Sequence, residues 1–324
     1  MKFSTQLFPE TPLQRVRWPI TDAAGVHFFV KREDLINPYW SGNKWYKLRG
    51  NVDAMKSQNK IGMVSFGGGY SNHLHALAYC GKALQIPTVG IVRGDYRHQL
   101  TPTLRDCEAA GMTLRFVDRK TYAQRYHPTF AAQLDPNLAD YWVIPEGGAN
   151  REGVLGCQVI AQSIQHQLDQ HLRCFDLSSS SHKSSIPTPF QVFVPCGTAT
   201  TLMGLISSLP EWANVHGVSV LKGEDTLTER VKQLLLDYGI KPHCQWSILT
   251  GYHSGGYGKF PPDLKAFMQA FEAECGFLLD PIYTVKMMRA IAAGVESGRW
   301  SKGDVVVAIH TGGLQGRRGY DLPM

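Results

Sequence analysis

Three glycine-rich clusters stand where a predicted strand runs into a predicted helix. They are SFGGGYSNH (65–73), VPCGTATTLMG (194–204) and HTGG (310–313). A turn of small residues at such a junction aims several free backbone N–H groups at one point and lets a ligand approach closely. The turn Gly197-Thr198-Ala199-Thr200-Thr201 is the best candidate for binding a phosphate, because its threonines add hydroxyl donors. Taken alone, it also fits a turn that is rich in small residues only for packing.

Lys44, in the segment WSGNKWYKL (40–48), is the second candidate. The run Ser41-Gly42-Asn43 predicts a tight turn and the start of a helix, with Lys44 in its first turn. The positive end of the helix dipole favours the neutral amine there, and that is the nucleophilic form a Schiff base requires. The alternative is a solvated surface lysine, which is the ordinary situation of this residue.

The elements that must position these residues alternate between strand and helix. After a mostly extended first 45 residues with a strand at 26–30, we expect strands at 62–66, 88–92 and 113–117 and helices at 71–84 and 104–110. Further along we expect strands at 191–195, 218–221 and 305–309 and helices at 153–172, 202–209, 226–238 and 264–271. Thr226 and Glu229 have capping-box spacing, and the Ser-rich stretch 176–189 predicts a loop. The alternation predicts an α/β fold with parallel sheets.

Composition excludes several classes of protein. The 324 residues are 43% hydrophobic and 19% charged, as in globular chains, and no apolar run is long enough to span a membrane. Seven scattered cysteines without a CxxC pair argue against disulfides and metal, and together with the lack of a signal peptide they predict a cytoplasmic protein. The net charge of +6 comes without a basic run, which favours small anions over nucleic acid as partners.

Taken together, the motifs are similar to those of one family. VKREDLINPYWSGNKWYKL (30–48), GGGYSNH (67–73), the threonine-rich turn and HTGG resemble, in this order, the pyridoxal 5'-phosphate (PLP) enzymes that include 1-aminocyclopropane-1-carboxylate (ACC) deaminase and D-cysteine desulfhydrase. The resemblance covers about Thr11 to Gly313, and KRED followed closely by GNKxxKL is a specific signal.

The resemblance implies a two-domain α/β fold of the β-family (fold type II), related to the tryptophan synthase β subunit. Its parallel twisted sheets carry helices on both faces. A large domain would comprise residues 1–48 and 151–324, a small one residues 49–150, and the cofactor would lie in the cleft between them.

It also implies the roles of individual residues. Lys44 would form the Schiff base. Lys47 and the turn from Gly197 to Thr201, with the backbone of Thr198, Ala199, Thr200 and Thr201, would hold the phosphate. Asn72 would bind the phenolic oxygen of the ring, and Thr284 and Thr311 would lie near its nitrogen. Ser71, Asn72 and His73 would receive the substrate, with Ser71 also moving protons, and Tyr257 and Tyr283 would face cofactor and substrate.

Three positions bear on the reaction. Members that deaminate ACC typically have Glu where this chain has Thr284, Leu where it has Thr311, and Gln where it has His73. A threonine leaves the ring nitrogen neutral, which suffices for eliminating a good leaving group such as a thiolate. We therefore expect D-cysteine desulfhydrase-type α,β-elimination on a small amino acid, giving pyruvate, ammonia and sulfide.

Alternative functions and alternative residue roles also fit the sequence. ACC deamination is the first alternative, a racemase or a lyase for a bulkier amino acid the next, and a non-catalytic PLP or amino-acid binding protein the last. Ser71 has a plain helix cap as its rival role, and the two tyrosines are also ordinary half-buried aromatics. Trp45, Tyr46 and Tyr70 depart from the family pattern, as does LQGRRGY after HTGG. We expect a homodimer.

Overall fold

A computed structural model describes residues 10–40, 42–176, 188–223 and 226–324. Its contacts divide the described chain into two units, which we treat separately. The first comprises Ile36–Gly156 and Gly313–Met324, and the second Glu10–Leu35 and Cys157–Gly312. The division that the sequence predicts, 49–150 against the rest, stays a prediction; in the structure 36–48, 151–156 and 313–324 group with 49–150.

The first unit is built on a parallel four-stranded sheet in the order β5-β4-β3-β6. Helix α3 packs on β3 and β4, and Val64, Phe66 and Ile91 contribute to a buried cluster on the sheet. The elements are α2 (Asn43–Ser57), β3 (Gly62–Gly68), α3 (Asn72–Leu84), β4 (Thr88–Arg93), α4 (Pro102–Ala109), β5 (Thr113–Val117), α5 (Arg119–Tyr122), η3 (Ala123–Tyr126), α6 (Phe130–Leu134), η4 (Pro136–Asp140), β6 (Tyr141–Ile144), η5 (Glu146–Gly148) and η6 (Leu314–Tyr320).

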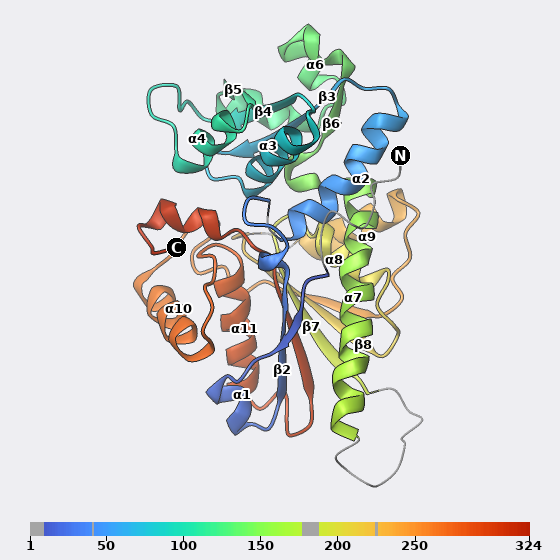
Figure 1. The fold of residues 1–324 in the computed structure, drawn as a ribbon, viewed down its shortest axis with the longest axis vertical. Helices are drawn as coiled ribbons and strands as arrows, with labels where there is room; N and C mark the ends of the chain where they lie inside the picture. The colour runs from blue at the N-terminus through green and yellow to red at the C-terminus, as the bar shows by residue number, and fades with distance from the viewer. Residues whose placement is uncertain (1–9, 41, 177–187, 224–225) are drawn as a thin grey trace. The chain divides into compact units, whose positions relative to one another are not determined.

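The second unit is built on a six-stranded sheet in the order β1-β2-β10-β7-β8-β9, parallel except where β1 pairs with β2. Figure 1 shows β2, β7 and β8 running alongside one another with α11 and α7 beside them. The elements are β1 (Leu13–Arg15), α1 (Pro19–Ala23), β2 (His27–Arg32), η2 (Glu33–Leu35), α7 (Arg151–Asp176, whose first residues belong to the first unit), β7 (Phe190–Cys196), α8 (Thr200–Ile206), β8 (Ala213–Ser219), α9 (Leu227–Asp237), β9 (Gln245–Leu249), α10 (Pro262–Cys275), α11 (Thr284–Glu296) and β10 (Val305–His310).

The α/β prediction is confirmed, and most predicted elements occur within a few residues of their expected bounds. Strand β10 is buried along its whole length between β2 and β7, as its apolar sequence indicates. Among the described residues, no helix is long and apolar enough to cross a membrane. The predicted loop at 176–189 falls largely outside the described residues.

Some local predictions are wrong. The strand expected at 218–221 is β8, which ends at Ser219, and the extended N-terminal segment contains the short helix α1. The predicted capping box does not form at α9, because Thr226 has helical dihedral angles (φ −86°, ψ 0°) and Glu229 instead accepts a hydrogen bond from Lys232. The strands β6 and β9 and the helix α11 were not predicted.

Candidate active site

Helix α2 carries the two lysines of the GNKxxKL motif. It begins at Asn43, directly after Gly42, whose φ of 78° is the left-handed conformation that glycine adopts without strain. Lys44 Nζ donates to Asn43 Oδ1 at 3.0 Å, and Lys47 Nζ donates to the carbonyl of Gly147 at 3.0 Å. Lys44 is half-buried and Lys47 is buried, so neither is the solvated surface lysine of the alternative interpretation. Ser41, predicted to open this turn, lies outside the described residues.

Close backbone packing fixes α2 against the start of α7. A Cβ atom on Gly156 would lie 2.0 Å from the carbonyl oxygen of Tyr46, and one on Gly50 would lie 2.5 Å from that of Glu152. Only glycine permits this approach, and Tyr46 lies between the two lysines in sequence. These glycines were not predicted as positioning residues, although the repeated glycine in REGVLG (151–156) was an available signal.

The glycine-rich turn after β3 places Ser71 at the start of α3. A Cβ atom on Gly67 would lie 2.5 Å from Ser71 Oγ, so the turn requires glycine at this position. Ser71 Oγ accepts a hydrogen bond from the N–H of Leu74 at 3.2 Å, which makes it the N-cap of α3. Its hydroxyl proton remains available as a donor. The N–H groups of Asn72 and His73 belong to the first helical turn, where backbone donors have no intrahelical acceptor.

His73 lies in a buried hydrogen-bond chain that fixes its protonation. Ser65 Oγ donates its only proton to the carbonyl of Ile144 at 2.7 Å, so it can only accept from His73 Nε2, 2.9 Å away. The imidazole therefore carries its proton on Nε2 and a lone pair on Nδ1. Burial, with the charges of Lys44 and Lys47, lowers the pKa of His73 well below its ordinary value and keeps the ring neutral.

The Nδ1 atom of His73 is buried without a hydrogen-bond partner among the described residues. Such an atom is costly unless a ligand or water supplies a donor. Its side chain therefore suits a hydrogen-bond donor rather than a carboxylate, so a substrate carboxylate at this place would be met by the backbone N–H groups of Asn72 and His73. Both lysines of α2 are near enough to act on this imidazole.

In the second unit, the turn from Gly197 to Thr201 joins β7 to α8. Ala199 has a left-handed conformation (φ 55°, ψ 10°), unusual for a residue with a side chain. The hydroxyls of Thr198 and Thr200 lie 2.9 Å apart. A left-handed residue within such a turn makes successive N–H groups line a concave anion site, which fits a phosphate. Because β10 lies beside β7 in parallel, Thr311, directly after β10, lies at the same edge of the sheet.

Tyr283 lies next to this turn, and Tyr257 packs against Tyr283. A Cβ atom on Gly197 would be 3.5 Å from Tyr283 Cε1, so the phenol ring lies against the turn. The rings of Tyr257 and Tyr283 are 6.0 Å apart between centroids and meet edge to face at 71°. Tyr257 is 42% exposed, and Tyr283 is half-buried. The structure thus brings both predicted tyrosines together beside the predicted phosphate turn.

Thr284 is engaged by Asp280. Its hydroxyl donates to Asp280 Oδ2 at 2.8 Å and accepts from the N–H of Asp280 at 2.9 Å, which leaves one lone pair for any ligand. Asp280 also accepts from the N–H groups of Ile282, Tyr283 and Thr284 at 2.8–2.9 Å. This carboxylate therefore accepts four hydrogen bonds, which fills its usual capacity.

The residues present fit PLP as a cofactor in both units. In the first, Lys44, Lys47, Ser71, Asn72 and the unpartnered Nδ1 of His73 lie at the starts of α2 and α3, and Lys47 and His73 both lie close to Gly148. In the second, the left-handed turn at Ala199 offers a place for a phosphate, beside Tyr283. The hydroxyl proton of Thr284 is committed to the carboxylate of Asp280.

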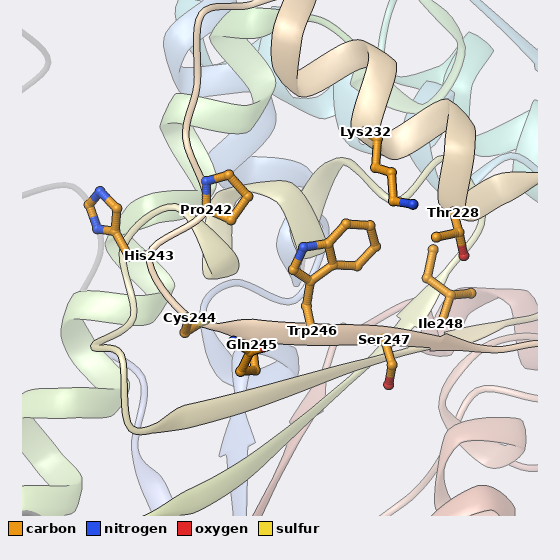
Figure 2. Close-up of a pocket in the computed structure, with 9 residues that line it drawn as sticks. All are labelled: Thr228, Lys232, Pro242, His243, Cys244, Gln245, Trp246, Ser247 and Ile248. Atoms are coloured by element: carbon orange, nitrogen blue, oxygen red, sulfur yellow. The ribbon is translucent and has the colours of Figure 1, made fainter.

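A hollow elsewhere on the second unit lies apart from these residues. It has a volume of about 680 Å³ and is lined by Thr228 and Lys232 of α9 and by residues 242–248 (Figure 2). Figure 2 shows the indole of Trp246 standing in it between Pro242 and Lys232. No predicted site residue contributes to its lining, so we do not place the chemistry there.

Comparisons with known proteins show the family and the fold of this chain. The family model described as pyridoxal-phosphate dependent enzyme matches residues 5–312. A protein of Pyrococcus horikoshii, provisionally named as a 1-aminocyclopropane-1-carboxylate deaminase, is 26% identical over 96% of this chain and 92% of its own. The mitochondrial bifunctional D-cysteine desulfhydrase/1-aminocyclopropane-1-carboxylate deaminase of Arabidopsis thaliana is 26% identical over 94% of this chain and 77% of its own. The crystal structure of an ACC deaminase homologue has the same fold, with a TM-score of 0.77 and 24% identity over 97% of this chain and 93% of that one.

Proposed function

We propose, from the premise that this chain belongs to the family of pyridoxal-phosphate dependent enzymes, that it is a lyase that eliminates the β-substituent of a small amino acid. D-cysteine is the proposed substrate. With one water, it would give pyruvate, ammonia and hydrogen sulfide. The relatives named as D-cysteine desulfhydrases and ACC deaminases support this class of substrate.

One observation carries the proposal. The neutral imidazole of His73 is buried with Nδ1 unpartnered among the described residues, under the influence of both lysines of α2 and at the start of α3. A buried acceptor near two amines and the N–H groups of a helix start supports a binding site for a charged small molecule over a packing arrangement.

The resemblance to the family implies which residues would hold PLP. Lys44 would bind it covalently, and Lys47 with the turn from Gly197 to Thr201 would bind its phosphate. Asn72 would donate to its phenolic oxygen. Because the Thr284 hydroxyl already donates to Asp280, Thr311 is the threonine we propose to face the ring nitrogen. PLP, when bound, supplies the electron sink that makes the Cα proton of the substrate acidic.

The substrate would be oriented by the start of α3. The N–H groups of Asn72 and His73 would receive its carboxylate, as helix N-termini do. Lys44 Nζ or Ser71 Oγ would take the Cα proton. Tyr257 and Tyr283 would face the cofactor and substrate and limit the size of side chain accepted.

The choice of elimination rests on positions 284 and 311. Neither carries a carboxylate, and the one carboxylate bonded to Thr284, that of Asp280, has its acceptor capacity filled. A ring nitrogen without a carboxylate partner makes a weaker electron sink. That is sufficient to expel a thiolate and unfavourable for opening a cyclopropane.

The test is spectroscopic and kinetic. The pure protein should absorb in the visible range, borohydride should abolish the band, and mass spectrometry should find the reduced cofactor on Lys44. D-cysteine or β-chloro-D-alanine should release pyruvate with a higher kcat/KM than ACC releases 2-oxobutyrate. A higher kcat/KM for ACC would make this an ACC deaminase, and bound PLP without any turnover would make it a binding protein.

The setting of the enzyme is part of the proposal. We propose a homodimer in the cytoplasm. The thiols of Cys80, Cys107, Cys244 and Cys275, which are buried or half-buried and form no disulfide, support a reducing compartment. Size-exclusion chromatography with light scattering should give about twice the 36.1 kDa chain mass. A monomer at micromolar concentration would contradict the dimer.

A further inference from the structure

We infer that Gln315, in η6, is a positioning residue that decides which end of the Asn72 carboxamide faces the cofactor. This inference rests on the proposed function, because it takes Asn72 as the ligand of the phenolic oxygen. Gln315 lies in LQGRRGY, where the chain departs from the family pattern. In Figure 1 this is the dark red helix near the C-terminus.

The contact is one short hydrogen bond. Gln315 Nε2 donates to Asn72 Oδ1 at 2.7 Å, across 243 positions of sequence. A carboxamide has an acceptor end and a donor end. With its oxygen held by Gln315, Asn72 presents its two Nδ2 protons on the other side. A phenolic oxygen that carries negative charge needs a donor, so this orientation is the productive one.

A second set of contacts connects the backbone of η6 to α3 through the side chains of Arg318, Asp106 and His75. Arg318 Nε donates to the carbonyl of Gln315 at 3.2 Å, and its guanidinium forms an ion pair with Asp106 of α4. Asp106 Oδ2 also lies 3.2 Å from Nε2 of His75, which follows Asn72 by three residues in α3. These contacts hold in place the segment that carries the Gln315 side chain.

One glycine lets η6 approach this closely. A Cβ atom on Gly319 would lie 2.7 Å from the ring of Tyr70, whereas one on Gly316 would make only an ordinary contact with Asn72 Oδ1, at 3.8 Å. Tyr70 directly precedes the N-cap Ser71. The segment thus packs against both the turn and the first residue of α3, which favours positioning over an incidental surface contact.

The experiment changes only the donor. In Gln315→Glu a carboxylate oxygen replaces the amide nitrogen, so Asn72 must turn its donor end towards residue 315 and its oxygen towards the cofactor. We expect the Kd for PLP, titrated into the apoprotein, to rise by roughly 3- to 10-fold, the scale of one hydrogen bond. The pH midpoint of the visible band should move upward, because a donor to an anionic oxygen lowers its pKa. Gln133→Glu, on the exposed face of α6, is the charge-matched control and should change neither quantity.

A second variant guards against misfolding. Gln315→Met keeps the length of the side chain without charge, and should give the same direction with a smaller rise in Kd. With Asn72→Ala as background, Gln315→Met should add nothing, since the two residues act as one unit. Melting temperatures of the apoproteins report folding separately.

The outcomes separate the two claims. If Asn72→Ala leaves Kd and spectrum unchanged, Asn72 is not a cofactor ligand and that part of the proposed function is wrong. If Asn72→Ala weakens binding but both Gln315 variants match the wild type, the positioning role is overturned. Additive effects of Asn72→Ala and Gln315→Met would overturn it as well.

Discussion

Two buried polar networks, one in each unit, differ in how they end. In the first, the chain from Ile144 through Ser65 reaches His73 and stops at Nδ1, which is buried without a partner among the described residues. In the second, Asp280 accepts four hydrogen bonds, and the Thr284 hydroxyl both donates to it and accepts from its N–H. The sequence predicts one candidate site residue in each network, His73 in the first and Thr284 in the second. We therefore propose a ligand at the open network and a scaffold at the closed one.

Variants in the two networks are expected to have different effects. Variants around the open one should impair cofactor binding or turnover with little loss of stability. Variants in the closed one should unfold the protein before they change its chemistry.

The largest effect is expected for Lys44→Ala. Turnover should fall by about 10⁴-fold or more, since both the covalent attachment and a proton acceptor are lost. Some PLP should still bind through the phosphate turn, without a borohydride-fixable adduct. Pyruvate release and mass spectrometry measure the two effects. Lys56→Ala, exposed near the end of the same helix, is the control, and equal rates for the two variants would remove Lys44 from the site.

Ser71→Ala should come next. If Ser71 moves a proton in the rate-limiting step, kcat should fall by about 10²- to 10⁴-fold. If it only binds the substrate, KM should rise with kcat little changed. Either way the lost cap of α3 should cost about 1 kcal/mol of unfolding free energy.

Asp118→Ala is the matched control for this loss of a cap. Asp118 caps the neighbouring helix α5 from an exposed position in the same unit. The Asp118→Ala variant should lose stability without a change in kcat or KM. Kinetics of Ser71→Ala equal to those of Asp118→Ala would show that Ser71 is a cap and nothing more.

Asp280→Ala tests the closed network. It leaves the buried N–H groups of Ile282, Tyr283 and Thr284 without their acceptor, and we expect a loss of about 2–4 kcal/mol of unfolding free energy. Denaturant titration measures it. Asp263→Ala removes only an exposed ion pair with Arg289 and should cost less than about 1 kcal/mol. A stable Asp280→Ala protein that has lost PLP would reverse the assignment of scaffold and site.

Sequence patterns predicted the elements whose burial is periodic or continuous. Strands such as β3 and β10 and the helix α3 carry their signal in consecutive residues. The edge strand β9 has no continuous apolar run, because it is only half-buried. Helix α11 begins inside the DPIYTVK motif, whose residues were interpreted for chemistry alone.

The sequence predicted which residues belong to the candidate site. It did not predict which of their hydrogen-bond donors and acceptors remain available to a ligand. Thr284 and His73 both stand in family motifs, yet only the fold shows that Asp280 takes the proton of one and that Ser65 fixes the tautomer of the other. Gln315 lies 243 residues from Asn72, so no local pattern indicates their contact. Long-range pairing decides which polar groups remain open, and consecutive residues do not encode it.

The smallest effect concerns Lys286, whose charge interacts with that of Asp280 in the closed network. It is fully buried, and its Nζ donates to the carbonyl of Gly256, beside Tyr257, at 2.8 Å. Burial lowers the pKa of Lys286 from 10.5 to about 8, against the opposing charge of Asp280.

The sign of the pH dependence follows from this lowered pKa. Between pH 8 and 10.5 the unfolded chain holds the Lys286 proton while the folded protein has released it, so stability from this group rises with pH. The unfolding free energy of the wild type minus that of Lys286→Met should therefore increase by about 1 kcal/mol from pH 8 to pH 9. Urea titrations at the two pH values measure it, with Lys265→Met, an exposed lysine of α10, as the control. A difference that stays constant would mean that Lys286 keeps its proton when folded and that the closed network holds a charged pair with Asp280.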